Sequence, residues 1–386
     1  MNKIISLLKK DVMLSVSLIA AIISFFITPP SKEILHSIDF KTLATLFMLL
    51  TVLEGFKKEN IFSPLLKIAL KFNSPFKLTV FLVYCVFFSS MFVTNDVSLI
   101  IFVPITIILF RQIKKEQFIL PVLTFENIAA VRGSLLTPFG SPQNLFLYTQ
   151  SGISTSEFLK MMFPLWIFSF FLLFIFILFL YRKNIHEKID ISSLKNENTF
   201  SEGNQNNSTK FKKALYLFLF CLVIFCIVSR TKFWPQIVLI LTIALLIFDR
   251  KILLKTDYAL LFTFFCFFIF SSSISRNPAI AQFLEKTVST HEYFWSITLS
   301  QLISNVPASI VLWPFTSPNG LRALLYGLDS AGLCSIIGSL ASVINLSLYT
   351  KEFPEGTFAF LKTFTIISLI FFAIVVIPQL LLLKIY

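Results

Sequence analysis

Long apolar runs, separated by short loops rich in Lys and Arg, constrain this chain more than any other feature. Runs of this kind enter a hydrocarbon core of about 30 Å. With 56% hydrophobic and only 14% charged residues, the chain has too little polar surface to cover a soluble globule. The sequence therefore predicts an all-α polytopic membrane protein. The runs lie at about 12–28, 38–54, 78–110, 118–149, 158–181, 214–229, 235–249, 257–275, 292–316, 330–350 and 357–384.

The residues that serve enzymes, metal sites and ATP-driven pumps form no recognisable motif in this sequence. The five Cys lie in apolar runs without CxxC spacing and the three His are scattered, so no metal site is predicted. The sequence contains no G-x-x-x-x-G-K-[ST] loop and no H-E-x-x-H motif. We therefore expect neither enzyme activity nor a cofactor. Transport by such a chain must draw its energy from an ion gradient or from a partner.

The net charge of +13 lies mainly in the loops between apolar runs and not along one soluble face. This distribution is typical of a topology signal, because cytoplasmic loops are enriched in Lys and Arg. It does not predict nucleic-acid binding. We expect a multi-pass protein of the inner (plasma) membrane with a cytoplasmic N-terminus, about nine crossings, two hairpins and the C-terminus outside. The polar segment 182–213 is expected to be a cytoplasmic linker.

The two halves of the chain contain similar peptides in the same order. "VTNDVSLIIFVPI" aligns without a gap with "ISNVPASIVLWPF", so that Asn95 meets Asn305. Further along, "GSPQNLFLYTQ" resembles "GSLASVINLSLYTK" after a three-residue gap, which pairs Asn144 with Asn345. Upstream of both, "DFKTLATLF" loosely resembles "DYALLFTFF". Three such pairs with similar spacing predict a duplicated unit.

The run at 78–110 is too long for one straight crossing, because it would measure about 50 Å at 1.5 Å per residue. We expect a break at Thr94–Asp96, which gives two arms of about 15 residues and about 22 Å each. Basic residues flank both ends of this run and predict a re-entrant hairpin with both feet in the cytoplasm. The run at 292–316 has little positive charge nearby, which predicts a hairpin from the outside. The first inverted repeat is then 1–181, and the second follows one extra helix within 214–386.

The polar residues at the two breaks have the chemistry of ion sites. Broken helices leave unpaired carbonyl and N–H groups, and carbonyl, Asn and hydroxyl oxygens suit a small cation such as sodium. Helices that start at a break present their positive ends to an anion. Two alternatives stay open: Ser90 and Ser300 also fit bonds to an upstream carbonyl, and Asp96 either binds a cation or proton or pairs with Arg132. The candidate cation ligands are Ser90, Thr94, Asn95, Asp96, Ser300, Ser304 and Asn305.

These peptides resemble those of the ion transporter superfamily, which includes divalent anion/sodium symporters, citrate carriers, arsenite permeases and some sodium/proton antiporters. The resemblance is carried by "TNDVSLIIFVP", "SNVPASIVL", "LTPFGSPQNLFLY" and "GSLASVINLSLY". It implies a scaffold and a moving transport part, a homodimer, and a broken helix after each hairpin. Arg132, at the first break, fits an anion ligand, a partner of Asp96 or a snorkelling residue. The substrate-binding candidates are Thr137, Gly140, Ser141, Asn144, Arg132, Ser335, Gly338, Ser339 and Asn345.

The sequence therefore predicts a secondary active transporter in the lipid bilayer. It is expected to carry a small anion, such as a di- or tricarboxylate, by alternating access, with sodium or a proton as the coupling ion. An arsenite or antimonite exporter and a sodium/proton antiporter are alternatives on the same fold. A channel is a further alternative, although a pore does not require two inverted pairs of broken helices.

Overall fold

The regular structure of this protein is helical throughout the part of the chain that the computed structural model describes, residues 12–29, 38–61, 68–69, 71–185, 187–188, 207–229 and 232–384. Seven helical segments in these ranges are long and apolar enough to cross a membrane, judged by length and composition. The predicted all-α polytopic membrane fold is confirmed. The count of nine crossings and the sides of the termini stay predictions. Most of the predicted linker lies outside the described residues.

The helices follow the predicted apolar runs closely. Helices of the first half are α2 (Val12–Ile27), α4 (Phe40–Lys58), α6 (Pro75–Val93), α7 (Asn95–Gln112), α8 (Ile119–Gly133), α9 (Pro142–Ser151) and α10 (Thr155–Tyr181). Those of the second half are α12 (Asn207–Ser229), α13 (Trp234–Lys255), α14 (Tyr258–Arg276), α15 (Pro278–Val288), α16 (Glu292–Ile303), α17 (Asn305–Leu312), α18 (Leu321–Cys334), α19 (Leu340–Glu352) and α20 (Thr357–Lys384).

Helices α4 and α14 begin with the same cap. Asp39 accepts a hydrogen bond from the N–H of Thr42, and Asp257 accepts one from the N–H of Leu260, both at 3.0 Å. The backbone angles of the two Asp residues are nearly equal, with φ −80° and ψ 83° in one and φ −74° and ψ 82° in the other. An Asp at this position satisfies N–H groups that the first turn leaves free. The loose similarity between the two peptides thus corresponds to a shared local structure.

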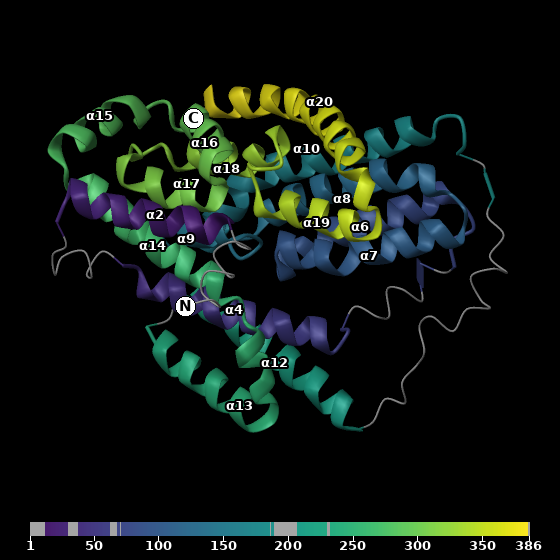
Figure 1. The fold of residues 1–386 in the computed structure, drawn as a ribbon, viewed down its shortest axis with the longest axis horizontal. Coiled ribbons are helices and arrows are strands. Elements are labelled where there is room, and N and C mark those ends of the chain that lie inside the picture. The colour runs from purple at the N-terminus through teal and green to yellow at the C-terminus, as the bar shows by residue number, and fades with distance from the viewer. Residues whose placement is uncertain are drawn as a thin grey trace.

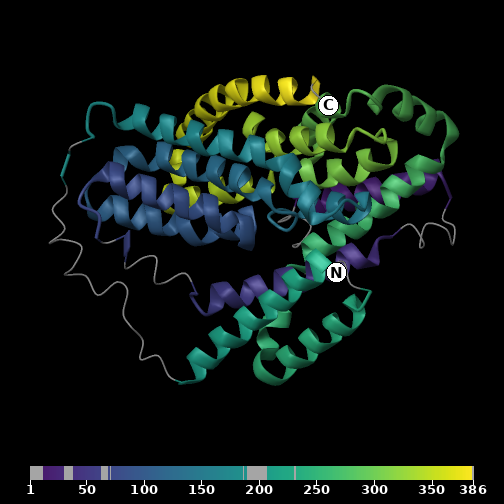
Figure 2. The ribbon, with the colours of Figure 1, turned by 180° about the vertical axis from the view of Figure 1, so that it is seen from behind.

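Equivalent helices of the two halves pack in exchanged pairs. Helix α2 packs against α14 and α13 against α4, while α9 packs against α17 and α19 against α7. Within each half, the helix before a hairpin tip packs on the helix before a glycine break, α6 on α8 and α16 on α18. Figures 1 and 2 show α4, α12 and α13 together on one side of the molecule and α20 on the opposite side. Such an exchange is typical of an internal two-fold repeat.

The arms of the first hairpin are longer than the sequence suggested. Helix α6 has 19 residues and α7 has 18, against an expected length of about 15 each, because Pro75 starts α6 at its first turn and α7 continues to Gln112. At 1.5 Å per residue the arms measure about 28 and 27 Å. The second hairpin has arms of 12 and 8 residues, too short to cross. The re-entrant insertion of both hairpins stays a prediction.

A buried carboxylate holds α4, α12 and α13 together. Asp249 interrupts α13 with φ −160° and ψ 63°, and its Oδ2 accepts hydrogen bonds from Lys58 Nζ at 2.5 Å and Tyr216 Oη at 3.0 Å. The ring of Tyr216 covers Gly55 so closely that a Cβ there would lie 2.1 Å from the ring. These contacts fix the layer against which the rest of the molecule packs.

Asp249→Ala is expected to lower the stability of the solubilised protein by about 1–3 kcal/mol, because Lys58 and Tyr216 lose a charged hydrogen-bond partner. Denaturant titration followed by tryptophan fluorescence would measure the change. Arg250→Gln, at an exposed neighbour, is the control and should stay within about 0.5 kcal/mol of the parent. Equal stability of the Asp249 variant would show that this carboxylate does not hold the three helices.

Candidate functional site

Each hairpin turns at one residue whose backbone conformation is rare for residues other than glycine. Thr94, between α6 and α7, has φ 69° and ψ 155°, and Ser304, between α16 and α17, has φ 70° and ψ 159°. This region is populated almost only by Gly, and holding another residue there costs of order 1–3 kcal/mol. The same strained geometry at two aligned positions indicates that both tips are built for a purpose beyond chain reversal.

Each tip is tied to a glycine by one backbone hydrogen bond. The N–H of Asn95 donates to the carbonyl of Gly140 at 3.2 Å, and the N–H of Asn305 donates to the carbonyl of Gly338 at 3.3 Å. These glycines lie in the breaks that separate α8 from α9 and α18 from α19. The start of α7 therefore lies beside the start of α9, and the start of α17 beside the start of α19.

Both glycines are sterically required. A Cβ on Gly140 would lie 2.1 Å from the carbonyl oxygen of Ser134, and a Cβ on Gly338 would lie 2.1 Å from that of Ala331. Real side chains never approach so closely, so the chain passes itself at these two points only because Gly lacks a Cβ. The two halves thus share the tip, the hydrogen bond and the close backbone crossing.

The residues just before α9 and α19 are Ser141 and Ser339, which are buried and have extended backbone conformations. Asn144 lies three residues beyond Ser141, whereas Asn345 lies six residues beyond Ser339. By this count Asn144 corresponds to Ser342, and the two Asn residues that the sequence pairs across a gap lie at different positions after the two breaks. Asn345 instead donates to a carbonyl of α8 at 2.8 Å, away from the break.

The remaining hydroxyl candidates support the backbone around the tips. Ser90 and Ser300 are fully buried and donate to carbonyls one turn earlier in their own helices, at 2.9 and 2.6 Å. Thr137 donates to a carbonyl near the end of α6, which joins the first break to the first hairpin. Ser335 donates to Oε1 of Gln301 at 2.6 Å and joins the second break to α16.

A cavity of about 80 Å³ lies between the first tip and the layer that contains α4. Asp96 enters it from the hairpin, while Glu54, Lys57 and Asp257 enter from α4 and from the start of α14. Lys57 forms an ion pair with Glu54, and Oδ1 of Asp96 is buried without a hydrogen-bond partner among the described residues. The cavity lining is Leu46, Leu49, Leu50, Glu54, Lys57, Thr94, Asp96, Val97, Ile100, Pro142, Asp257, Leu260, Leu340 and Ile344.

Arg132 lies in a different place from Asp96 and bonds to other partners. Its Nε donates to Ser169 Oγ on α10 at 3.0 Å, and its Nη1 donates to Ser330 Oγ and the Asp329 carbonyl on α18 at 3.3 and 3.4 Å. Gln143 on α9 donates to Oδ1 of Asp329 at 3.0 Å. These four helices therefore meet around a buried arginine and a buried aspartate.

Several polar residues of this region were not among the sequence candidates. Gln143 and Asp329 contact each other across the two halves, and Glu126 on α8 is fully buried, accepting a hydrogen bond from Thr106 on α7. Glu126 lies inside the apolar run at 118–149, which is a signal for a functional acid, whereas Asp329 lies just before the run at 330–350. The sequence gives no indication of the contact between Gln143 and Asp329, because this contact depends on how α9 packs against α18.

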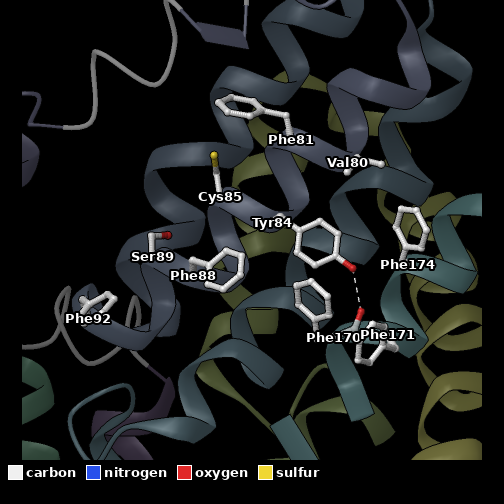
Figure 3. A pocket seen from close by; sticks show the side chains of 10 residues that line it. All are labelled: Val80, Phe81, Tyr84, Cys85, Phe88, Ser89, Phe92, Phe170, Phe171 and Phe174. Carbon is white, nitrogen blue, oxygen red and sulfur yellow. Dashed lines mark hydrogen bonds between the residues drawn. The ribbon is translucent and has the colours of Figure 1, made fainter. Parts of the chain in front are cut away.

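A wide apolar groove formed by the described residues does not belong to this site. Figure 3 shows this groove, whose rings come from α6 and α10. Its volume is about 770 Å³. The hydroxyl of Tyr84 in this groove donates a hydrogen bond to the carbonyl of Phe170 at 2.8 Å. Within the described ranges no charged residue lines it, as expected of a lipid-facing surface. The lining consists of Val80, Phe81, Tyr84, Cys85, Phe88, Ser89, Phe92, Phe170, Phe171 and Phe174.

Comparison with known proteins agrees with this architecture. A family model described as citrate transporter matches residues 3–317. The chain is 32% identical over 330 residues to an uncharacterized transporter of Methanocaldococcus jannaschii, in a match that covers 84% of this chain and 86% of that protein. It is 29% identical over 338 residues to the inner membrane protein YbiR of Escherichia coli, in a match that covers 84% of each chain. The chain is therefore a membrane transporter and belongs to the citrate transporter family.

Proposed function

We propose that this protein is a secondary active transporter that couples the movement of a small anion, of the di- or tricarboxylate class, to sodium ions or protons. One observation above all supports the proposal. The same strained tip and the same hydrogen bond to a glycine carbonyl occur twice, at Thr94–Asn95 and at Ser304–Asn305. Non-helical backbone inside a membrane is tolerated where it is buried in protein or lines a cavity, and two related tips fit the midplane site of an inverted repeat.

The helix starts around the tips favour an anion. Helices α7, α9, α17 and α19 all begin at these breaks, and the first N–H groups of a helix have no partner within it. The positive ends of helices stabilise negative charge. Ser141 Oγ and both side-chain polar atoms of Asn144 are buried without a hydrogen-bond partner among the described residues. We assign the Ser141 hydroxyl and the Asn144 Nδ2 as donors to a carboxylate of the substrate.

The arrangement of layers supports alternating access. In the proposed cycle, the hairpins and broken helices move as one body past the layer of α4, α12 and α13, and the cavity beside Asp96 lies at the boundary between the two. Its volume of about 80 Å³ holds one small group, such as a carboxylate, or a few water molecules. A larger substrate then requires the two bodies to separate, which is the motion that alternating access supplies.

A sodium/proton antiporter is the second candidate, and the charges of the cavity favour it. Three carboxylates, those of Glu54, Asp96 and Asp257, face this cavity with a single ammonium group, that of Lys57, among the described residues. An excess of negative charge attracts cations. An antiporter on this fold would move both ions through this cavity without an organic substrate.

Uptake into proteoliposomes is the experiment that decides between these functions. Labelled citrate, succinate and malate would be supplied with an inward sodium gradient, an inward proton gradient, or neither. We expect saturable uptake of at least one carboxylate, counterflow, and stimulation by one of the gradients. Sodium-dependent proton efflux without uptake of any carboxylate would support the antiporter and contradict the proposal. Uptake without saturation or counterflow would indicate a channel.

A further inference from the structure

A buried arginine and a buried aspartate lie near each other between the two halves, and each has a polar atom without a hydrogen-bond partner among the described residues. Arg132 and Asp329 are both buried, yet their charged groups form no ion pair within the described part of the chain. Nη2 of Arg132 and Oδ2 of Asp329 each have no hydrogen-bond partner among the described residues. A buried charge normally uses its full hydrogen-bonding capacity, so two unused atoms at one place point to a binding function.

We propose that Arg132 and Asp329 couple anion binding to proton binding: the substrate anion binds the guanidinium group of Arg132, and Asp329 takes up a proton at Oδ2 from the aqueous phase that the site then faces. The inference rests on the proposed anion transport and names the proton as the coupling ion. No covalent bond to the substrate changes in this step. The proton returns to water when the anion leaves on the other side.

The reason is charge balance in a medium of low dielectric constant. Without an anion, one positive and one negative group compensate each other across the core. A bound carboxylate adds a second negative charge that shares the same arginine, and two buried carboxylates beside one cation cannot both keep their charge at low cost. Protonation of Asp329 restores neutrality, so each ligand strengthens the binding of the other.

The neighbours of Asp329 contain no competing acid among the described residues. Helix α16 contributes the Tyr293 hydroxyl, which donates to Gln379 Oε1 of α20, and Gln379 Nε2 donates to Ser330 Oγ at 2.6 Å. On α18 itself, Tyr326 donates to a carbonyl of α10 at 2.8 Å. Within these ranges, Arg132 on α8 is the only charged side chain that acts on the Asp329 carboxylate, and it contacts the backbone carbonyl of Asp329. The neutral neighbours of the carboxylate are Gln143 and Asn144 on α9.

The pair is also connected to the second hairpin tip. The Asn305 side-chain Nδ2 donates to the carbonyl of Leu328, the residue before Asp329, at 3.4 Å. On the other side, Asn144 follows Gln143 and presents two buried polar atoms that have no hydrogen-bond partner among the described residues. Asp329 therefore lies one residue from a contact with the second tip, and Gln143, which donates to Asp329, lies one residue from Asn144 of the first break.

The test uses the full protein in proteoliposomes with the membrane potential clamped by potassium and valinomycin. For one proton per anion, an inward gradient of one pH unit should drive about tenfold accumulation of the labelled carboxylate. Asp329→Asn, which mimics the protonated acid, should retain counterflow exchange but lose this accumulation. Glu187→Gln, which removes a loop carboxylate that binds Lys115, is the matched control and should accumulate like the parent.

The possible outcomes separate the two proposals. Carboxylate uptake that ignores the proton gradient in the parent would overturn the coupling while anion transport stands, and absence of any carboxylate uptake would overturn both. Proton-driven accumulation in Asp329→Asn would overturn the role of Asp329. Should that variant not fold, Asp329→Glu should still accumulate the anion but with a displaced pH optimum, and an unchanged optimum would contradict the inference. Infrared spectra should show a protonated carboxyl band that citrate induces in the parent only.

Discussion

Replacement of Asn95 or Asn305 by Ala is expected to abolish cation-dependent transport while the folded protein remains in the membrane. In each variant the backbone N–H keeps its hydrogen bond to a glycine carbonyl, but the amide group of the Asn side chain is lost. Asn95 Oδ1 accepts from the N–H of Asp96 at 2.9 Å, and Asn305 Nδ2 reaches α18. The loss of positioned ligands at a transport site should lower gradient-driven uptake by about a hundredfold.

The measurement is initial uptake at equal amounts of reconstituted protein, with Asn319→Ala as the control. Asn319 lies in an exposed turn after the second hairpin, and its replacement should leave uptake unchanged. Elution volume and thermal stability would show that the variants are folded. Cation-dependent uptake that persists in both tip variants would remove these residues from the site.

Gly140→Ala and Gly338→Ala are expected to have effects of similar size, but for a steric reason. The new Cβ would lie 2.1 Å from the carbonyl oxygen of Ser134 or Ala331, so the backbone must move. The same shift displaces the carbonyl that binds the N–H of a hairpin tip. We expect a loss of transport together with a decrease in stability of about 1–3 kcal/mol in each variant.

Uptake and thermal unfolding of the detergent-solubilised variants would be measured side by side. Gly152→Asn is the control, because Gly152 ends α9 with φ 73° and Asn tolerates this conformation. This variant should transport like the parent. Normal transport by both Ala variants would show that the close crossings at the breaks are dispensable.

The hairpin tips can be predicted from the sequence because few structures place polar residues in the middle of a long apolar run, and a helix break is one of them. Run length and the aligned peptides place Thr94 and Ser304 at breaks, and the structure gives both the same backbone conformation. Gly140 and Gly338 follow from a resemblance between peptides, and both prove to be points of close backbone approach. Local signals of this kind depend on residues that are near each other in the chain.

Other features depend on packing between distant helices and have no local signal. The contact between Gln143 and Asp329 joins residues that are 186 positions apart. Alignment with Asn144 assigns Asn345 to the substrate, but a match after a gap does not fix a helical register, and its side chain bonds to α8. The amphipathic helix α15 escapes prediction because its 11 residues, with Gln, Glu, Lys and Thr among them, form no apolar run.

The sides from which the hairpins enter the membrane are the central claim of this account. Single cysteines would replace Lys77 and Lys114, near the ends of the first hairpin, and Thr290 and Asn319, near the ends of the second, in a variant without the five native cysteines. All four positions are exposed. Labelling with a membrane-impermeant maleimide in right-side-out and inverted vesicles would then report the side of each residue.

We expect the cysteines introduced at positions 77 and 114 to react only from the cytoplasmic face and those at 290 and 319 to react only from outside. Labelling of positions 77 and 114 from opposite faces would contradict this expectation, because α6 and α7 would then together form one crossing and not a hairpin that enters and leaves on the same face.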